Sequence, residues 1–251
     1  MPLYKKIIKA GDVLEHEIYF SVRERGKTVP REPRRAPTTE AQAKLNEINR
    51  IKHFRRKINA NFVPGDLYLT LSYADEPNPE KAMRYLSNFI RRINYSRKKA
   101  NLENVKFIAV TEYQGKRLHH HVIMSRISAE EVIAQWEKTP GAGNVEIQTL
   151  YSHDTDYSNL ADYLMKETRS RTGKRWTESR NLKQPTIIYT NASKQDKKAL
   201  QGGKPYVPKG YTLIEENRVA DDITGISCYF KYIKNARLSN SRTQNKKGKI
   251  Q

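Results

Sequence analysis

Apolar and polar positions alternate most clearly in the middle of the chain. Leu67, Leu69 and Leu71 are separated by hydroxyl-bearing side chains, which is the period of a half-buried β-strand. Asn78-Pro79 then offers a helix cap with proline at the first helical position. Behind it, apolar side chains recur at the spacing of one helix face: Ala82, Leu86, Phe89, Ile90 and Ile93. A strand followed by an amphipathic helix is therefore expected.

Further elements follow up to about residue 167. They are a strand over 105–113, a loop over 114–117, a strand over 118–124, a helix over 128–136, a strand over 145–150 and a helix over 156–167. Ser128 and Glu131 have the spacing of a capping box, and Pro140-Gly141 ends the helix that they begin. The order β-α-β-β-α-β-α predicts an α+β fold with a ferredoxin-like, or RRM-like, core. Such a core has a central antiparallel sheet with two helices on one face, here with an extra C-terminal helix.

The flanking segments give weaker patterns. One strand is expected over 14–22, and a helix is expected to begin at Thr39, which has capping-box spacing to Gln42. That helix carries four apolar positions on one side: Leu45, Ile48, Ile51 and Ile58. Two strands are expected over 211–214 and 225–232. The predicted domains are 1–60, a strand and basic helix packed on the core; 61–167, the core; 168–235, a basic extension with strands; and 236–251, a basic disordered tail.

Charge and cysteine content narrow the classes of function. The 251 residues include 47 Lys and Arg against 27 Asp and Glu, a formal net charge of +20. A field of this sign favours nucleic acid as partner, although a generally basic soluble protein is the simpler alternative. Cys228 is the only cysteine, which excludes an internal disulfide framework and a multi-cysteine zinc site. The sequence has no apolar run of about 18 residues and no signal-like N-terminus, so a cytoplasmic protein is expected.

The run His119-His120-His121 is the strongest chemical signal in the chain. Because side chains alternate along a strand, His119 and His121 share one face, and His120 points to the other, where a structural role is expected. The loop over 114–117 sets a hairpin register that places Glu112 opposite His119. Glu112, His119 and His121 are therefore expected to converge.

Two imidazoles and one carboxylate can hold a divalent metal and leave positions open for water and substrate. A hard ion suits a phosphate oxygen, so the expected cofactor is Mn²⁺ or Mg²⁺, and the nitrogen ligands favour Mn²⁺. On a basic protein, such a site predicts phosphate chemistry on nucleic acid. The alternative is that these histidines are ordinary strand residues or contact phosphate directly.

Tyr163 is the candidate nucleophile. It lies within the helix expected over 156–167, and Lys166 follows three residues later on the same face. A free tyrosine has a pKa near 10, so Lys166 would help it lose its proton or would neutralise the scissile phosphate. Tyrosines on amphipathic helices also serve as core residues, and Tyr157 and Tyr151 are nearby competitors.

Basic residues and one aromatic follow the candidate nucleophile helix: Arg169, Arg171, Lys174, Arg175 and Trp176. Arg117 lies in the loop before the histidine strand. Cations for the backbone and a ring for stacking are what single-stranded nucleic acid requires, so these residues are candidate DNA contacts. A solvated loop is the alternative.

Three motifs together resemble the HUH endonucleases, in particular the rolling-circle replication initiators of plasmids and phages. Leu69-Thr70-Leu71-Ser72-Tyr73 resembles the apolar first motif, His119-His120-His121 the histidine motif, and Tyr163 with Lys166 the nucleophile motif. The resemblance covers roughly residues 38–167. It departs from the pattern at His120, where a hydrophobic residue is usual, and at Asn159, where two-tyrosine initiators carry their other nucleophile. The chain therefore resembles the single-tyrosine class.

The resemblance implies metal-dependent, site-specific nicking and joining of single-stranded DNA through a 5′-phosphotyrosine intermediate, which would initiate rolling-circle replication in a bacterial host. The implied partners are an origin hairpin or nick site and a host polymerase. A host helicase is implied as well, because the chain has no Gly-x-x-x-x-Gly-Lys-Ser/Thr loop. With one tyrosine, termination would use water, another cycle or a second subunit, which makes a dimer one expected form.

Two other functions stay open. A single-tyrosine transposase of the same superfamily would share the chemistry but act on stem-loops at insertion-element ends. A non-catalytic RRM-like nucleic-acid-binding module would share the element order, but such modules carry aromatic rings on their central strands. Glu112 and His119 occupy the corresponding positions here, which favours a metal site.

Overall fold

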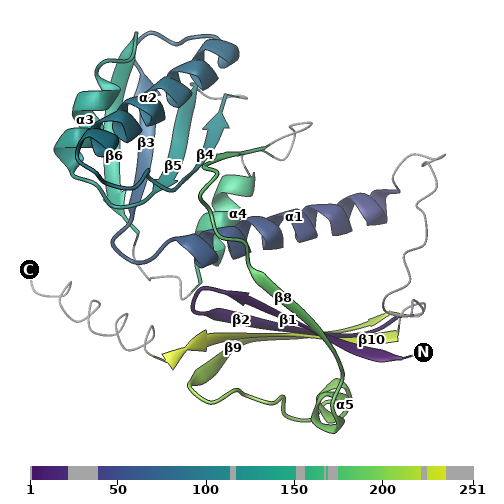
Figure 1. The fold of residues 1–251 in the computed structure, drawn as a ribbon. Helices are drawn as coiled ribbons and strands as arrows, with labels where there is room; N and C mark the ends of the chain where they lie inside the picture. The colour runs from purple at the N-terminus through teal and green to yellow at the C-terminus, as the bar shows by residue number, and fades with distance from the viewer. Residues whose placement is uncertain are drawn as a thin grey trace, which may run out of the picture. The chain divides into compact units, whose positions relative to one another are not determined.

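The computed structural model describes residues 2–21, 39–113, 117–150, 156–166, 168, 175–221 and 225–235. These residues form an α+β fold with two antiparallel five-stranded sheets and five helices (Figure 1). The chain divides into two compact units, Asn61–Lys183 and the combination of Met1–Ala60 with Gln184–Gln251. The predicted fold class, α+β, is confirmed, and the predicted tail over 236–251 lies outside the described residues.

The unit Asn61–Lys183 contains the elements that the central pattern predicts. In chain order they are β3 Leu67–Tyr73, α2 Pro79–Lys99, β4 Phe107–Glu112, β5 His119–Met124, α3 Ala129–Trp136, β6 Ala142–Thr149, α4 Ser158–Lys166 and β7 Thr177–Glu178. Its sheet has the strand order β6-β3-β5-β4-β7, with every neighbouring pair antiparallel. Strands β3 and β5 are therefore neighbours in the middle of the sheet, although they are far apart in the chain.

Helices α2 and α3 pack against one face of this sheet (Figure 1). The two helices begin as predicted: Asn78 Oδ1 accepts a hydrogen bond from the Lys81 amide, and Ser128 Oγ accepts one from the Glu131 amide. The apolar stripe predicted for α2 is buried along its whole length: Ala82, Leu86, Phe89, Ile90 and Ile93. Because the odd-numbered side chains of β3 face this core, the even-numbered ones lie on the opposite face of the sheet.

The other unit is built on a second sheet. Its elements are β1 Leu3–Ala10, β2 Val13–Phe20, α1 Glu40–Asn61, β8 Thr186–Asn191, α5 Lys194–Leu200, β9 Tyr211–Asp221 and β10 Gly225–Lys234. The strand order is β8-β1-β2-β10-β9. On one face, α5 contributes Ala199 and Leu200 to an apolar core with Ile18, Phe230 and Tyr232.

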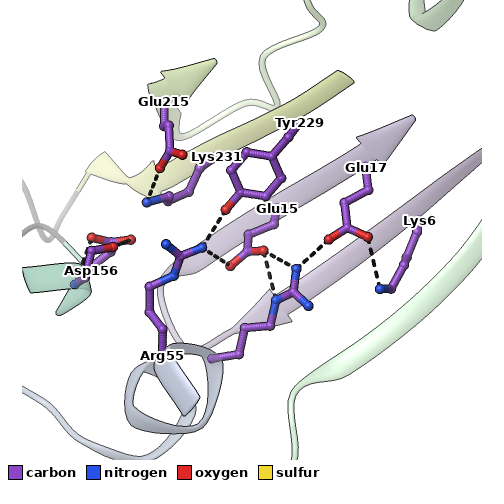
Figure 2. A network of polar contacts seen from close by, with 10 residues as sticks. Lys6, Glu15, Glu17, Arg55, Asp156, Glu215, Tyr229 and Lys231 are labelled. Atoms are coloured by element: carbon purple, nitrogen blue, oxygen red, sulfur yellow. Dashed lines mark hydrogen bonds and ion pairs between the residues drawn. The ribbon is translucent and has the colours of Figure 1, made fainter. Parts of the chain in front are cut away.

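A buried network of charges joins α1 to the other face of this sheet (Figure 2). Arg56 donates hydrogen bonds to Glu15 at 2.9 Å and to Glu17 at 2.6 Å, and Lys6 donates to Glu17 at 3.0 Å. Arg55 donates to the Tyr229 hydroxyl at 2.8 Å. Glu15 is fully buried. Since an uncompensated buried carboxylate is very costly, the arginines of α1 hold this helix in a defined position on β2.

Two predictions for the N-terminal region are wrong in part. The strand expected over 14–22 is present as β2, but it pairs in a hairpin with β1, a strand that the sequence pattern does not predict. Residues Leu3–Ala10 contain adjacent lysines and adjacent isoleucines, and both faces of the strand are largely buried, so no period of two shows in the sequence. Gly11 makes the turn at φ +59°, and a Cβ there would lie 2.1 Å from the carbonyl oxygen of Asn59.

The second wrong prediction concerns α1. Its start is right, because the Gln42 amide donates to Thr39 Oγ1 at 3.3 Å, and Ile58 is buried as expected. Leu45 and Ile48 were expected on the buried side, but they are 50% and 43% exposed. Within the described residues, the sheet packs only against the C-terminal half of α1. The apolar side chains at helical spacing therefore extend beyond the part of the helix that is buried.

The C-terminal region also differs from the expectation. The sequence pattern places 1–60 and 168–235 in separate domains, whereas β1 pairs with β8 and β2 pairs with β10 in one sheet. Strands β7 and β8 and helix α5 have no counterpart among the predicted elements. Among the described residues, no helix has both the length and the apolar composition that crossing a membrane requires.

Candidate active site

The histidine hairpin has the predicted register. Glu112 pairs with His119 and Val110 pairs with His121 across β4 and β5. Thr70 of β3 pairs with His121 from the other side. His119 and His121 therefore lie on the face of the sheet opposite the core that α2 and α3 make. The predicted convergence of Glu112, His119 and His121 is confirmed, since one potential ligand atom from each lies within 4.8 Å of the others.

The three donor groups are close enough to share one ion. His119 Nε2 lies 3.1 Å from Glu112 Oε2, and His121 Nε2 lies 3.6 Å from the same oxygen. The two Nε2 atoms are 3.0 Å apart. Ligands at about 2.1 Å from an ion are separated by about 3.0 Å in octahedral geometry and about 3.4 Å in tetrahedral geometry. The observed separations fit a small divalent metal.

The partners of the other ring nitrogens support the same arrangement. His119 Nδ1 lies 2.8 Å from the carbonyl oxygen of Arg117, which can only accept a hydrogen bond. Nδ1 of His119 therefore carries the proton, and its Nε2 presents a lone pair. His121 Nδ1 lies 2.7 Å from the hydroxyl of Tyr68. A lone pair on His119 Nε2 faces the Glu112 carboxylate and His121 Nε2, and a cation between the three groups would be held by all of them, so the donor set fits a metal.

His120 points to the opposite face, as expected. It is fully buried, with Nε2 2.9 Å from the Tyr73 hydroxyl and Nδ1 2.8 Å from Thr111 Oγ1. Burial, with smaller contributions from the neighbouring histidines, lowers the pKa of His120 to about 3. A neutral imidazole with both nitrogens hydrogen-bonded is a core group, which is the structural role expected for this residue.

Tyr163 lies against the candidate metal site. Its ring contacts the ring of His121 edge to face, with the centroids 5.6 Å apart and the planes at 72°. Its side chain is 45% exposed, whereas Ala161, Leu164 and Met165 hold the other side of α4 in the interior. Lys166 is also exposed, one turn further along the helix. The structure thus brings the predicted nucleophile next to the predicted ligands.

The competing tyrosines differ in placement. Tyr157 is 1% exposed, so its hydroxyl does not face the solvent from which a substrate would bind. Its backbone has φ 54°, a left-handed conformation just before α4 begins. Tyr151 lies outside the described residues. The geometry therefore favours Tyr163 over Tyr157.

One residue of the site, Tyr68, is not indicated as a site residue by any pattern in the sequence. Tyr68 of β3 stacks on the His121 ring, with centroids 5.6 Å apart and planes at 8°, in addition to its hydrogen bond. Burial, followed by the nearby Tyr163, raises the pKa of Tyr68 well above its usual range, so its hydroxyl stays protonated. Finding Tyr68 requires the β3–β5 pairing, which joins segments about fifty residues apart and is not readable from local periodicity.

The predicted DNA contacts are only partly described. Arg117 is exposed, and its guanidinium donates to the Ala74 carbonyl at 2.5 Å. Arg175 is 7% exposed, and Trp176 donates from Nε1 to Glu178 at 2.7 Å. Arg169, Arg171 and Lys174 lie outside the described residues. Of the described members, Arg117 is the one that presents a charged group to solvent near the histidine strand.

One comparison with known proteins matches the part of the chain that contains the histidine hairpin. The family model of the replication-associated protein ORF2/G2P matches residues 66–169, a segment that contains the histidine hairpin and Tyr163. The crystal structure of the hypothetical protein ORF119 from Sulfolobus islandicus rod-shaped virus 1 is 12% identical, with a TM-score of 0.35 over 51% of this chain and 99% of that chain. No curated protein matches the sequence. Over residues 66–169, the chain is similar to the replication-associated protein ORF2/G2P family.

Proposed function

We propose that the protein is a metal-dependent, site-specific nuclease and strand transferase that nicks and rejoins single-stranded DNA, and that it initiates rolling-circle replication of a plasmid or phage. The observation that carries this proposal is the contact of the half-exposed Tyr163 ring with His121, a member of the three-donor group. A nucleophile beside a divalent-metal site is the arrangement that phosphoryl transfer to tyrosine requires. The similarity to the replication-associated family supports it.

The proposal includes a ferredoxin-like core for residues 61–167, with α4 as the helix that carries the nucleophile. Two observations support this assignment. The elements from β3 to β6 follow the order β-α-β-β-α-β, and their strands lie in the order β6-β3-β5-β4. Two central antiparallel strands with helices α2 and α3 on one face leave the other face for the site.

Glu112, His119 and His121 would hold Mn²⁺ or Mg²⁺, and the bound ion would supply Lewis-acid polarisation of the scissile phosphate. The hydroxyl of the half-exposed Tyr163 gives up its proton to water, and its oxygen attacks phosphorus. A bond from the tyrosine oxygen to the 5′ phosphate forms, the bond from phosphorus to the 3′ oxygen breaks, and the 3′ oxygen takes up a proton from water. Lys166 lies on the same side of α4, where its ammonium group favours the tyrosinate and the charged phosphate.

The covalent 5′-phosphotyrosine retains the energy of the broken bond, so attack by a 3′-hydroxyl can rejoin the strand. The free 3′-hydroxyl would be extended by a host polymerase, with unwinding by a host helicase. The substrate would be single-stranded DNA at an origin hairpin or nick site, to which the chain is attracted by its net charge of +20. Arg117, exposed beside His119, is the described basic residue best placed to contact it.

Labelled single-stranded oligonucleotides from DNA flanking the gene test this function. The oligonucleotides are incubated with the protein and Mn²⁺ and separated on denaturing gels. Wild type is compared with Tyr163→Phe and with a matched control, Tyr95→Phe, an exposed tyrosine on α2. We expect label to move onto wild type and Tyr95→Phe, but not onto Tyr163→Phe or onto wild type in EDTA.

The other outcomes separate the alternatives. A covalent adduct that survives Tyr163→Phe would move the nucleophile elsewhere. Cleavage confined to stem-loops from insertion-element ends would indicate a transposase. Binding that is insensitive to EDTA, without cleavage of any oligonucleotide, would indicate a non-catalytic binding module and overturn the proposal.

A further inference from the structure

We propose that Tyr68 is a positioning residue that sets the tautomer and the ring plane of His121 for metal binding. Its hydroxyl oxygen accepts a hydrogen bond from the Nδ1–H group of His121, so that the Nε2 lone pair faces Glu112 and His119. This inference rests on the metal site of the proposed function. It adds a residue that belongs to none of the three motifs and touches a ligand without being one.

The contact between the two side chains is specific in distance and in orientation. Tyr68 Oη lies 2.7 Å from His121 Nδ1, and the two rings are stacked, with centroids 5.6 Å apart and planes at 8°. Thr70, which pairs with His121 across β3 and β5, lies 3.4 Å from the same nitrogen. Tyr68 lies two residues before Thr70 and therefore on the same face of β3.

Two hydroxyl oxygens face the same ring nitrogen. Tyr68 Oη lies 2.7 Å from His121 Nδ1, and Thr70 Oγ1 lies 3.4 Å from it. A hydroxyl oxygen has lone pairs that accept a hydrogen bond, so the Tyr68 oxygen is able to accept from His121 Nδ1–H. In the arrangement we propose, donation runs from His121 to Tyr68, away from the three converging donors.

Tautomer control matters because a neutral imidazole has only one N–H. If the proton were on Nε2, it would point at the other ligands, and His121 could not bind an ion through that atom. The Arg117 carbonyl removes this ambiguity for His119 at 2.8 Å. Tyr68 provides the equivalent restraint for His121, and its stacked ring also opposes rotation of the imidazole.

The first test measures Mn²⁺ affinity by titration calorimetry on DNA-free protein. Tyr68→Phe keeps the stacking ring and removes only the hydroxyl, and Tyr95→Phe makes the same chemical change at an exposed site on α2. We expect Mn²⁺ to bind Tyr68→Phe about 10- to 100-fold more weakly than wild type. Tyr95→Phe should bind as wild type does. A second variant, Thr70→Val, should weaken binding in the same direction by a smaller factor.

The second test reads the tautomer itself, which a purely structural role for Tyr68 would not change. Long-range ¹H–¹⁵N spectra of the metal-free protein distinguish a protonated Nδ1 from a protonated Nε2. We expect His121 to be the Nδ1–H tautomer in wild type and a mixture of both tautomers in Tyr68→Phe. Thermal unfolding of the metal-free variants checks that both remain folded.

Wild-type affinity together with an unchanged His121 tautomer in Tyr68→Phe would overturn the inference. That result leaves the proposed function intact, because wild type would still bind the ion. If wild type itself binds no Mn²⁺, the metal site of the proposed function fails, and the role of Tyr68 fails with it. The wild-type titration therefore separates the two failures.

Discussion

The side chains of the three consecutive histidines lie in two different environments. His119 and His121 present ring nitrogens to Glu112, whereas His120 is enclosed between Tyr73 and Thr111. The alternation of a strand is enough to predict this division from sequence, because only the side-chain direction is needed. Tyr68 could not be predicted in this way, since its contact with His121 depends on which strands are neighbours in the sheet.

Because His120 is a core group and His119 is a candidate ligand, alanine at the first should reduce stability and alanine at the second should reduce metal binding. His120→Ala leaves a cavity and two hydroxyls without their partner, so we expect a loss of about 2–4 kcal/mol in the free energy of unfolding, measured with urea. His119→Ala alters a more exposed side chain and should change stability little while abolishing tight Mn²⁺ binding. A larger stability loss for His119→Ala than for His120→Ala would contradict this assignment.

At the scale of elements, the strong periodic segments were predicted well. Residues from β3 to α4 carry clear periods and recognisable caps, and every one of these elements is present. The missed elements lack such signals. β8 is an edge strand with exposed Ile187, Ile188 and Tyr189, and β1 is largely buried on both faces, so neither alternates. Their identity depends on long-range pairing, and local sequence does not contain that information.

The cap of α2 gives a prediction at this scale. Asn78 accepts from the Lys81 amide at 2.9 Å, so Asn78→Ala should cost about 1 kcal/mol in the free energy of unfolding. Asn78→Asp retains an oxygen acceptor at the same place and serves as the control, with stability close to wild type in urea melts. Equal losses for the two variants would show that the side-chain acceptor is not what stabilises this helix start.

At the scale of the whole molecule, acid should weaken the unit that contains His16. Burial, and then the charge of Lys5, lowers the pKa of His16 from 6.5 to about 4, against an opposing effect of Asp196. The Tyr232 ring lies beside the imidazole, tilted at 58° with the centroids 4.8 Å apart. The unfolded state therefore binds the extra proton first. Stability from neutral His16 is fully present above pH 6.5 and is lost as the pH falls towards 4, at about 1.4 kcal/mol per pH unit.

Urea melts at several pH values measure this dependence. The comparison variant is His16→Gln, which cannot titrate. Between pH 6.5 and 4 we expect a shallower fall in the free energy of unfolding for His16→Gln than for wild type. The same slope in both proteins would mean that His16 titrates normally in the folded state.

The net charge of +20 predicts that affinity for single-stranded DNA falls linearly on a plot of log affinity against log salt. Arg117→Ala should reduce the magnitude of that slope by about 0.7, which is the value for one lost phosphate contact. Arg91→Ala, at an exposed position on α2 away from the site face, is the control and should leave the slope unchanged. A slope unaffected by Arg117→Ala would remove this residue from the DNA interface.

The identity of the residue that carries the DNA tests the central proposal most directly. The covalent adduct formed with Mn²⁺ is digested with trypsin and sequenced by mass spectrometry. Tyr151, Tyr157 and Tyr163 all lie between Lys138 and Lys166, so fragment ions within that one peptide must decide among them. We predict a 5′-linked nucleotide on Tyr163. A nucleotide on Tyr157, Tyr151 or Tyr68, or cleavage that proceeds without any adduct, would contradict the assignment of Tyr163 as nucleophile.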